Sequence, residues 1–258
     1  MIQNDIQNQK DNRNIKIDKV GVKNISYPII VEDRTNKTQH TIANIDIFVD
    51  LTEVFRGTHM SRFLEVLNSY HQEVLIDNLE AFLNDIKEKL GSNTAYINLS
   101  FPYFIKKIAP VSKIESLLNY QCELSASLKN ELDFIIGVTA PVTALCPCSK
   151  EISEYGAHNQ RSAVTLKVKY KGFVWLEELI EYIESSASCE VFPLLKRVDE
   201  KFVTEQAYDN PYFVEDIVRE IAIKVKEDKR ITWFSVEAEN FESIHNHSAY
   251  AFIEQDNV

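Results

Sequence analysis

Glycine is scarce in this chain, and its scarcity limits what the chain can form. The 258 residues contain six glycines, and the two nearest, Gly156 and Gly172, stand sixteen positions apart. Dinucleotide-binding folds and P-loop folds hold phosphate on closely spaced glycines. This sequence contains neither of these glycine-rich motifs. Their absence excludes Rossmann enzymes, kinases and P-loop NTPases. Any nucleotide must be held by side chains and ordinary backbone amides.

Length and composition indicate a soluble globular protein. A chain of 258 residues can form one large domain or two modules of ordinary size, and its 45% hydrophobic and 26% charged residues are typical of folded domains. The formal net charge of -11 is the opposite of what a nucleic-acid binder shows. No stretch approaches the roughly eighteen apolar residues that a membrane span needs. We therefore expect a cytoplasmic protein with neither nucleic acid nor a membrane as partner.

The hydrophobic pattern alternates between strands and helices. From Thr41 to Leu51 apolar residues fall on every second position, as in a half-buried strand. Two helices follow, one capped by Thr58 and one that begins with Asp77 and Glu80 and stops at Gly91. The later elements are strands near 95–101, 118–126, 131–141 and 161–170, a helix near 173–187, a helix from Asn210-Pro211 to about Lys226, and strands near 231–239 and 248–253.

This order predicts an α+β fold in which each half of the chain reads ββααββ. We expect residues 1–15 to be a mobile polar tail, residues 16–128 to form a first module, and residues 129–258 to form a second that carries most candidate site motifs. Each module should be a four-stranded antiparallel sheet with a helix pair on one face. Such sheets have exposed edges, which closure into barrels with other subunits would cover. The alternative is one α+β sandwich whose edges are protected by loops and by the tail.

Three segments concentrate side chains that bind metals or titrate. They run from Cys146 to Arg161, from Lys196 to Glu200 and from Glu239 to His247, between predicted elements or at their ends, where binding sites are commonly built. Cysteine, histidine and carboxylate together suit zinc or a similar divalent metal, and three protein ligands leave a position open for water. The Cys-Pro-Cys spacing does not match structural zinc sites. Inert buried thiols and a hydrogen-bonded loop histidine are the alternative.

Other residues are candidates for acid-base chemistry and for binding an anion. His245 and His247 would face the same side of an extended segment, where one could polarise a reacting group and the other orient substrate, or both could be hydrogen-bonded bystanders. Glu215 would lie in the first turn of a helix, a favourable place for any carboxylate. Eight basic residues could bind phosphate: His59, Arg62, Lys106, Lys107, Lys113, Arg161, Lys196 and Arg197. Short basic runs, however, are most often solvated surface.

Four ordered motifs together resemble the type IB GTP cyclohydrolase family. The longest runs from Pro141 to Ser162 and reads PVTALCPCSKEISEYGAHNQRS. The others are GTHMSRF from Gly57, LLKRVDE from Leu194 and ENFESIHNHSAY from Glu239. The matches extend from about residue 17 to residue 253, which is nearly the whole chain.

The resemblance implies a fold, an assembly and a reaction. The fold would be the tunnelling fold, in which ββααββ modules assemble into barrels, and the assembly a homotetramer of two stacked barrels. The reaction would be that of GTP cyclohydrolase I: GTP and water give formate and 7,8-dihydroneopterin triphosphate, the first step of pterin and folate biosynthesis. The cofactor would be a divalent metal ion, which is zinc, manganese or iron.

The resemblance also implies residue roles around the metal. Cys146, His158 and Glu200 correspond to the family's metal ligands. Cys146 also counts among the catalytic residues, together with Glu242 and His245 in the family's catalytic loop.

Substrate binding is implied for a further set of residues. Glu215 corresponds to the glutamate that anchors the purine through its ring N–H and exocyclic amine. His59, Arg62, Lys196 and Arg197 are expected to bind the rest of the substrate GTP.

Two rival functions remain open at this point. A tunnelling-fold nitrile reductase would use a free cysteine as a covalent nucleophile and NADPH as hydride donor. A metal-stabilised pterin-binding or scaffold protein would bind without turnover.

Overall fold

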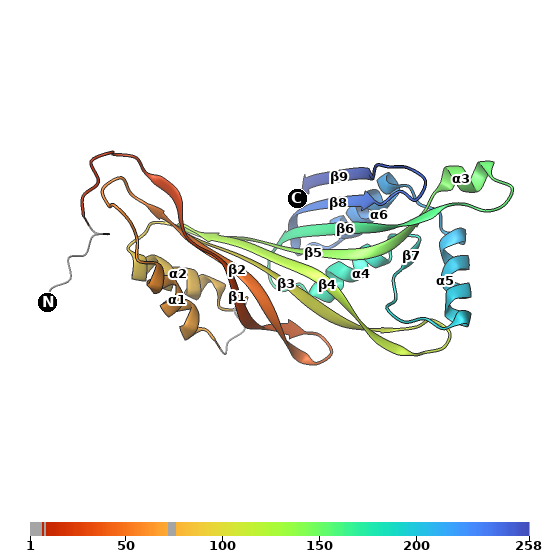
Figure 1. The fold of residues 1–258 in the computed structure, drawn as a ribbon, viewed down its shortest axis with the longest axis horizontal. Coiled ribbons are helices and arrows are strands. Elements are labelled where there is room, and N and C mark those ends of the chain that lie inside the picture. Colours follow the sequence, from red (N-terminus) through yellow and green to blue (C-terminus); the bar gives the residue numbers. More distant parts are fainter. Residues whose placement is uncertain (1–6, 8, 72–75, 258) are drawn as a thin grey trace. The chain divides into compact units, whose positions relative to one another are not determined.

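The structure, a computed structural model, describes residues 7, 9–71 and 76–257. Its elements in chain order are β1 (Ile17–Asp33), β2 (Lys37–Leu51), α1 (Met60–Ser69), α2 (Leu79–Leu90), β3 (Ala95–Ile108), β4 (Glu115–Leu128), β5 (Leu132–Leu145), α3 (Pro147–Ile152), β6 (Asn159–Tyr170), α4 (Leu176–Glu184), β7 (Cys189–Glu190), α5 (Arg197–Asp209), α6 (Val214–Glu227), β8 (Ile231–Asn240) and β9 (Ala249–Asp256). The strands form one sheet in the order β1-β2-β3-β4-β5-β6-β8-β9, with β7 paired to β5 (Figure 1). The α+β class is confirmed. The strands expected as one four-stranded sheet in each module are joined in one continuous sheet. No helix in the described part of the chain is long and apolar enough to cross a membrane.

The chain forms two compact units. Unit 1 consists of the described residues up to Pro102 with Glu123–Ile135, and unit 2 of Tyr103–Cys122 with the described residues from Ile136 onward. The long strands β3, β4 and β5 therefore contribute residues to both units. The module boundary predicted after residue 128 lies at the end of β4.

The predicted tail falls partly outside the described residues, which omit 1–6 and 8. Its described part pairs with a segment that follows β2. The Asp11 amide donates to the Val54 carbonyl oxygen at 3.0 Å, and the Arg56 amide donates to the Gln9 carbonyl oxygen at 3.0 Å.

In unit 1, the alternating apolar residues of β2 lie in the core. Ala43, Ile45, Ile47 and Val49 are fully or almost fully buried, and α1 and α2 pack against each other and onto β1 and β2. β1 approaches β2 so closely at Gly21 that a Cβ there would collide with the Ile47 carbonyl oxygen. Only glycine fits this position.

Both predicted helix starts in unit 1 differ slightly from the structure. The first helix begins at Met60 with His59 as N-cap, and no side chain caps it, so Thr58 is not the cap. The second begins at Leu79 with Asn78 as N-cap. Its predicted end is confirmed, because Gly91 adopts a left-handed conformation with φ of 65° at the C-cap.

In unit 2, α4 and α6 pack together and contact β6, β8 and β9. The buried face of α6 consists of Val214, Ile217, Val218, Ile221, Ala222 and Val225. Both helices were predicted with longer bounds, whereas α3, α5 and β7 were not predicted. The order ββααββ therefore holds for the predicted second module, residues 129–258, only with these three elements added.

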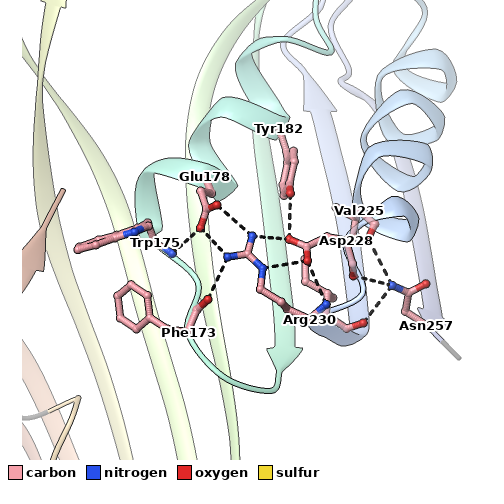
Figure 2. Close-up of polar contacts among 9 residues, drawn as sticks. Phe173, Trp175, Glu178, Tyr182, Val225, Asp228, Arg230 and Asn257 are labelled. Carbon is pink, nitrogen blue, oxygen red and sulfur yellow. Dashed lines mark hydrogen bonds and ion pairs between the residues drawn. The ribbon is translucent and has the colours of Figure 1, made fainter.

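A polar network joins the start of α4 to the turn between α6 and β8 (Figure 2). The Arg230 guanidinium donates to Glu178 Oε1 at 3.0 Å and to Asp228 Oδ2 at 2.7 Å. The Tyr182 hydroxyl donates to the same Asp228 oxygen at 3.0 Å. The Asn257 side-chain amide donates to three carbonyl oxygens around the turn, so the end of β9 is held to this turn.

Candidate active site

The pairing of β5 with β6 brings Cys146 and His158 together. The ladder ends with Leu145 opposite Asn159. Directly beyond it, the Cys146 amide donates to the His158 carbonyl oxygen at 3.2 Å. The two residues therefore lie side by side at the end of the ladder, with α3 in the connection between them.

Ser149 fixes the backbone around both residues. Cys146 is the N-cap of α3, and its Sγ accepts a hydrogen bond from the Ser149 amide at 3.4 Å. The Ser149 hydroxyl donates to the Cys146 carbonyl oxygen at 3.1 Å and accepts from the His158 amide at 3.2 Å. Cys146 is half-buried, whereas Cys148 is exposed. The two thiols of the Cys-Pro-Cys motif thus occupy different surroundings.

The His158 imidazole is surrounded by polar side chains on its Nδ1 side. Nδ1 lies 2.9 Å from Gln160 Oε1, 3.5 Å from Ser243 Oγ and 4.0 Å from Glu242 Oε2. Gln160 Nε2 also donates to Glu242 Oε1 at 3.5 Å. The structure brings the predicted residues His158 and Glu242 together and adds Gln160 and Ser243, which the sequence analysis missed.

The loop between β8 and β9 is anchored beside this imidazole. The Phe241 amide donates to the Arg161 carbonyl oxygen at 3.0 Å. Farther along the loop, His245 and His247 are exposed and their rings stack with centroids 5.1 Å apart. The loop is irregular and not the extended segment that was expected, but the two rings do lie side by side.

Glu200, the third predicted metal ligand, is exposed in the first turn of α5. Its neighbour Asp199 is fully buried and accepts hydrogen bonds from the amides of Lys196, Val111 and Ser112 at 2.8 to 2.9 Å. Burial alone would raise the pKa of Asp199, but these hydrogen bonds and that of the Ser112 hydroxyl hold it well below its usual value. Asp199 therefore fixes the helix start that carries Glu200.

Glu215 is exposed in the first turn of α6. The approach to this helix is tied to the end of β5, because the Tyr212 amide donates to the Leu145 carbonyl oxygen at 3.1 Å. Glu215 is thus three residues away from Tyr212, which contacts Leu145, the neighbour of Cys146.

The basic candidates divide into those that line a cavity and those that are exposed. In unit 1, His59 and Arg62 line a cavity of about 270 Å³ together with Lys89, which the sequence analysis missed. In unit 2, Lys196 and Arg197 are exposed at the start of α5.

Lys107 is not available for an anionic ligand. It is buried and forms ion pairs with Glu184, at 2.8 Å, and with Glu190. Glu190 in turn lines a cavity of about 340 Å³ with Gln160 and Arg161.

The chain is similar to known proteins over almost its full length. Residues 3–251 match the family model of type I GTP cyclohydrolase folE2. The chain belongs to this family. The relative "GTP cyclohydrolase FolE2" of Geotalea uraniireducens is 60% identical over 98% of this chain and 93% of its own length. The protein of the same name from Geobacter sulfurreducens is 58% identical over 98% of both chains.

Solved structures show the same fold at low sequence identity. A urate oxidase of Bacillus sp. TB-90 has a TM-score of 0.55 at 11% identity, covering 93% of this chain and 100% of its own. A uricase from Arthrobacter globiformis has a TM-score of 0.52 at 8% identity, covering 92% of each. This chain therefore has the tunnelling fold of these proteins, as expected.

The side chains of Cys146 and His158 fit a divalent metal of the zinc type. They offer a thiol sulfur and an imidazole whose Nδ1 is engaged by other groups, which leaves Nε2 as the ligand atom. Among the described residues, no three His, Cys, Asp or Glu side chains form a group that could hold a metal ion. Glu200 as third ligand accordingly stays a prediction.

Proposed function

We propose that this chain is a metal-dependent GTP cyclohydrolase that converts GTP to formate and 7,8-dihydroneopterin triphosphate. The observation that carries the proposal is its 60% identity, over 98% of the chain, to a protein named GTP cyclohydrolase FolE2. The backbone hydrogen bond between Cys146 and His158 supports the proposal, because it brings together two residues whose side chains bind divalent metals.

The metal would be held by Cys146, His158 and Glu200, and it is zinc, manganese or iron. Guanine C8 is a weak electrophile, so hydrolysis at neutral pH requires an activated water. A bound divalent metal supplies such a nucleophile by lowering the pKa of water. Water addition at C8 opens the imidazole ring of guanine to a formamide, and a second hydration releases formate.

Proton transfers are the proposed role of His245 and Glu242. Imidazole donates and accepts protons near neutral pH, so His245 can protonate N7 as the purine ring opens and return a proton during the later rearrangement and ring closure. Glu242 lies beside His158 and accepts from Gln160, which places its carboxylate in the polar surroundings of the proposed ligand.

Recognition of the substrate is proposed for two sets of residues. The Glu215 carboxylate can accept two parallel hydrogen bonds from guanine N1–H and the 2-amino group, which adenine does not offer. Arg62, Lys196 and Arg197 provide positive charge for the triphosphate, and His59 is a further candidate for hydrogen bonding to it. Lys89 joins His59 and Arg62 in lining one cavity and is added to this set.

The test is turnover of GTP by purified protein loaded separately with zinc, manganese and iron(II). Neopterin fluorescence after oxidation should appear with GTP and not with ATP, and formate should be released in equal amount. A metal-loaded protein that binds GTP without releasing formate would contradict the proposal and indicate a binding protein.

A further inference from the structure

Gln160 is a buried glutamine that contacts two residues of the candidate site. It lies on β6 opposite Ala144 of β5, with 8% of its surface exposed. Its Oε1 is 2.9 Å from His158 Nδ1, and its Nε2 is 3.5 Å from Glu242 Oε1. One side chain therefore spans the distance between the imidazole and the carboxylate.

The carboxylate determines which way the amide points. An ionised carboxylate only accepts hydrogen bonds, whereas a glutamine amide has a donating and an accepting side. The NH₂ of Gln160 must therefore face Glu242, and its carbonyl oxygen must face His158. The reverse orientation would bring two acceptor oxygens together and leave the donor at Nδ1.

This orientation determines the tautomer of the imidazole. A carbonyl oxygen 2.9 Å from Nδ1 requires that Nδ1 carry the proton. Glu242 Oε2, 4.0 Å from the same nitrogen, favours a proton there as well, and the Ser243 hydroxyl at 3.5 Å can accept from it. The lone pair of the neutral ring is then on Nε2, which makes no hydrogen bond within the described part of the chain.

We propose that Gln160 is a positioning residue that holds His158 in the Nδ1–H tautomer and presents Nε2 to a divalent metal. The inference rests on the proposed function, because it concerns the same metal site. Residues that accept from the far nitrogen of a metal-binding histidine fix its ring orientation, and their loss typically weakens metal binding about 10–100-fold. Through Glu242, Gln160 also connects this imidazole to the loop that carries His245.

The experiment measures the tautomer and the metal affinity without substrate. Metal-free protein with ¹⁵N-labelled histidine is examined by NMR above pH 8, with His158→Gln identifying the His158 signals, and zinc affinity is measured by competition with a chelator. The wild type should show the Nδ1–H tautomer. Gln160→Met, of similar length but without either polar group, should lose this preference and bind zinc about 10–100-fold more weakly. The control is Gln255→Met on the exposed part of β9, which should change neither.

A second variant separates the two contacts of the amide. Gln160→Glu keeps an acceptor for Nδ1 and loses the donor to Glu242, so it should retain the Nδ1–H tautomer. This variant tests the inference even if Gln160→Met does not fold. An Nε2–H tautomer in the wild type would overturn the inference, as would unchanged tautomer and zinc affinity in folded Gln160→Met. The tautomer and zinc measurements use no GTP. A protein that meets these expectations but does not turn over GTP would therefore refute the proposed function and leave the inference about Gln160 standing.

Discussion

Cys146 and Cys148 are two positions apart but differ in what surrounds them. Cys146 is half-buried, accepts from the Ser149 amide and adjoins His158, while Cys148 is exposed. Replacing Cys146 with alanine should lower bound metal and reduce turnover more than about a hundredfold, since even a residue that only supports a ligand contributes about 10–100-fold. Metal analysis and turnover of Cys146→Ala are compared with Cys148→Ala, which should be mild. An essential Cys148 with a dispensable Cys146 would refute the assignment.

Glu215 allows a test of purine recognition. In Glu215→Gln the amide presents an N–H where guanine also donates, and an unsatisfied polar contact costs about 1 to 3 kcal/mol. We expect kcat/KM for GTP to fall roughly tenfold or more, with little change in melting temperature because the side chain is exposed. Unchanged kinetics with a lower melting temperature would mean that Glu215 only favours the first turn of α6.

The sequence pointed to some residues of the candidate site and not to others. The motif with Cys146 and His158 could be recognised because cysteine and histidine are rare and chemically specific residue types. The antiparallel pairing of β5 with β6 explains why these two residues, twelve positions apart, lie side by side. Gln160 has no such signature, since a buried amide acts through the direction of its hydrogen bonds. Lys107 was misread as a candidate anion-binding residue because sequence does not show that two carboxylates neutralise it.

At the scale of elements, three helices of unit 2 begin in the same way. In each, an acidic residue three positions after the N-cap accepts a hydrogen bond from the N-cap amide. The pairs are Trp175 and Glu178 in α4, Lys196 and Asp199 in α5, and Phe213 and Asp216 in α6. The sequence pattern showed α4 and α6 because each has a buried apolar face. It did not show α5, which buries only Asp199 and Ala207. The acidic residue Asp199 could nevertheless have indicated the start of a helix there.

Arg230 stabilises the start of α4 through Glu178 and the turn between α6 and β8 through Asp228 (Figure 2). Partial burial would raise the pKa of Glu178, but hydrogen bonds from Arg230 and the Trp175 amide lower it overall. Hydrogen bonds from Arg230 also lower the pKa of Asp228. A lowered carboxyl pKa stabilises the fold above the unfolded-state value, near 4, and this contribution is lost as the pH falls.

Removing the guanidinium should therefore destabilise the protein in a pH-dependent way. Arg230→Met should lose about 1 to 3 kcal/mol at pH 7. The loss should shrink as the pH falls below about 4, where the same carboxyls become protonated in the unfolded chain and their stabilising contribution begins to be lost. Melting temperatures at pH 7 and pH 3.5 measure this. Arg219→Met is the matched control, because Arg219 is 67% exposed and its only ion pair among the described residues, to Asp216, spans 3.6 Å. A loss at pH 3.5 equal to that at pH 7 would show that packing, and not charge, explains the effect.

At the scale of the whole molecule, sequence periodicity identified most strands but not how they join. Alternation shows which residues of a strand face the core, and it is the same whether eight strands form two sheets or one. The structure shows one strand order that ends with β1 on one side and β9 on the other. The edge of β9 also exposes large apolar side chains, with Tyr250 61% and Phe252 50% exposed.

Exposed edge strands with apolar side chains favour pairing with another chain, and we predict that this protein is a homotetramer in which such edges are covered. Light scattering should give a mass near four times 29.8 kDa. Phe252→Lys places a charge at the β9 edge and should shift the protein toward smaller species with a loss of turnover. Ile223→Lys is the control, because Ile223 is 54% exposed but lies on α6 and not on the edge strand, and it should leave the mass unchanged. A wild type that is monomeric and fully active, or a Phe252→Lys variant with unaltered mass, would mean that β9 is not a subunit contact.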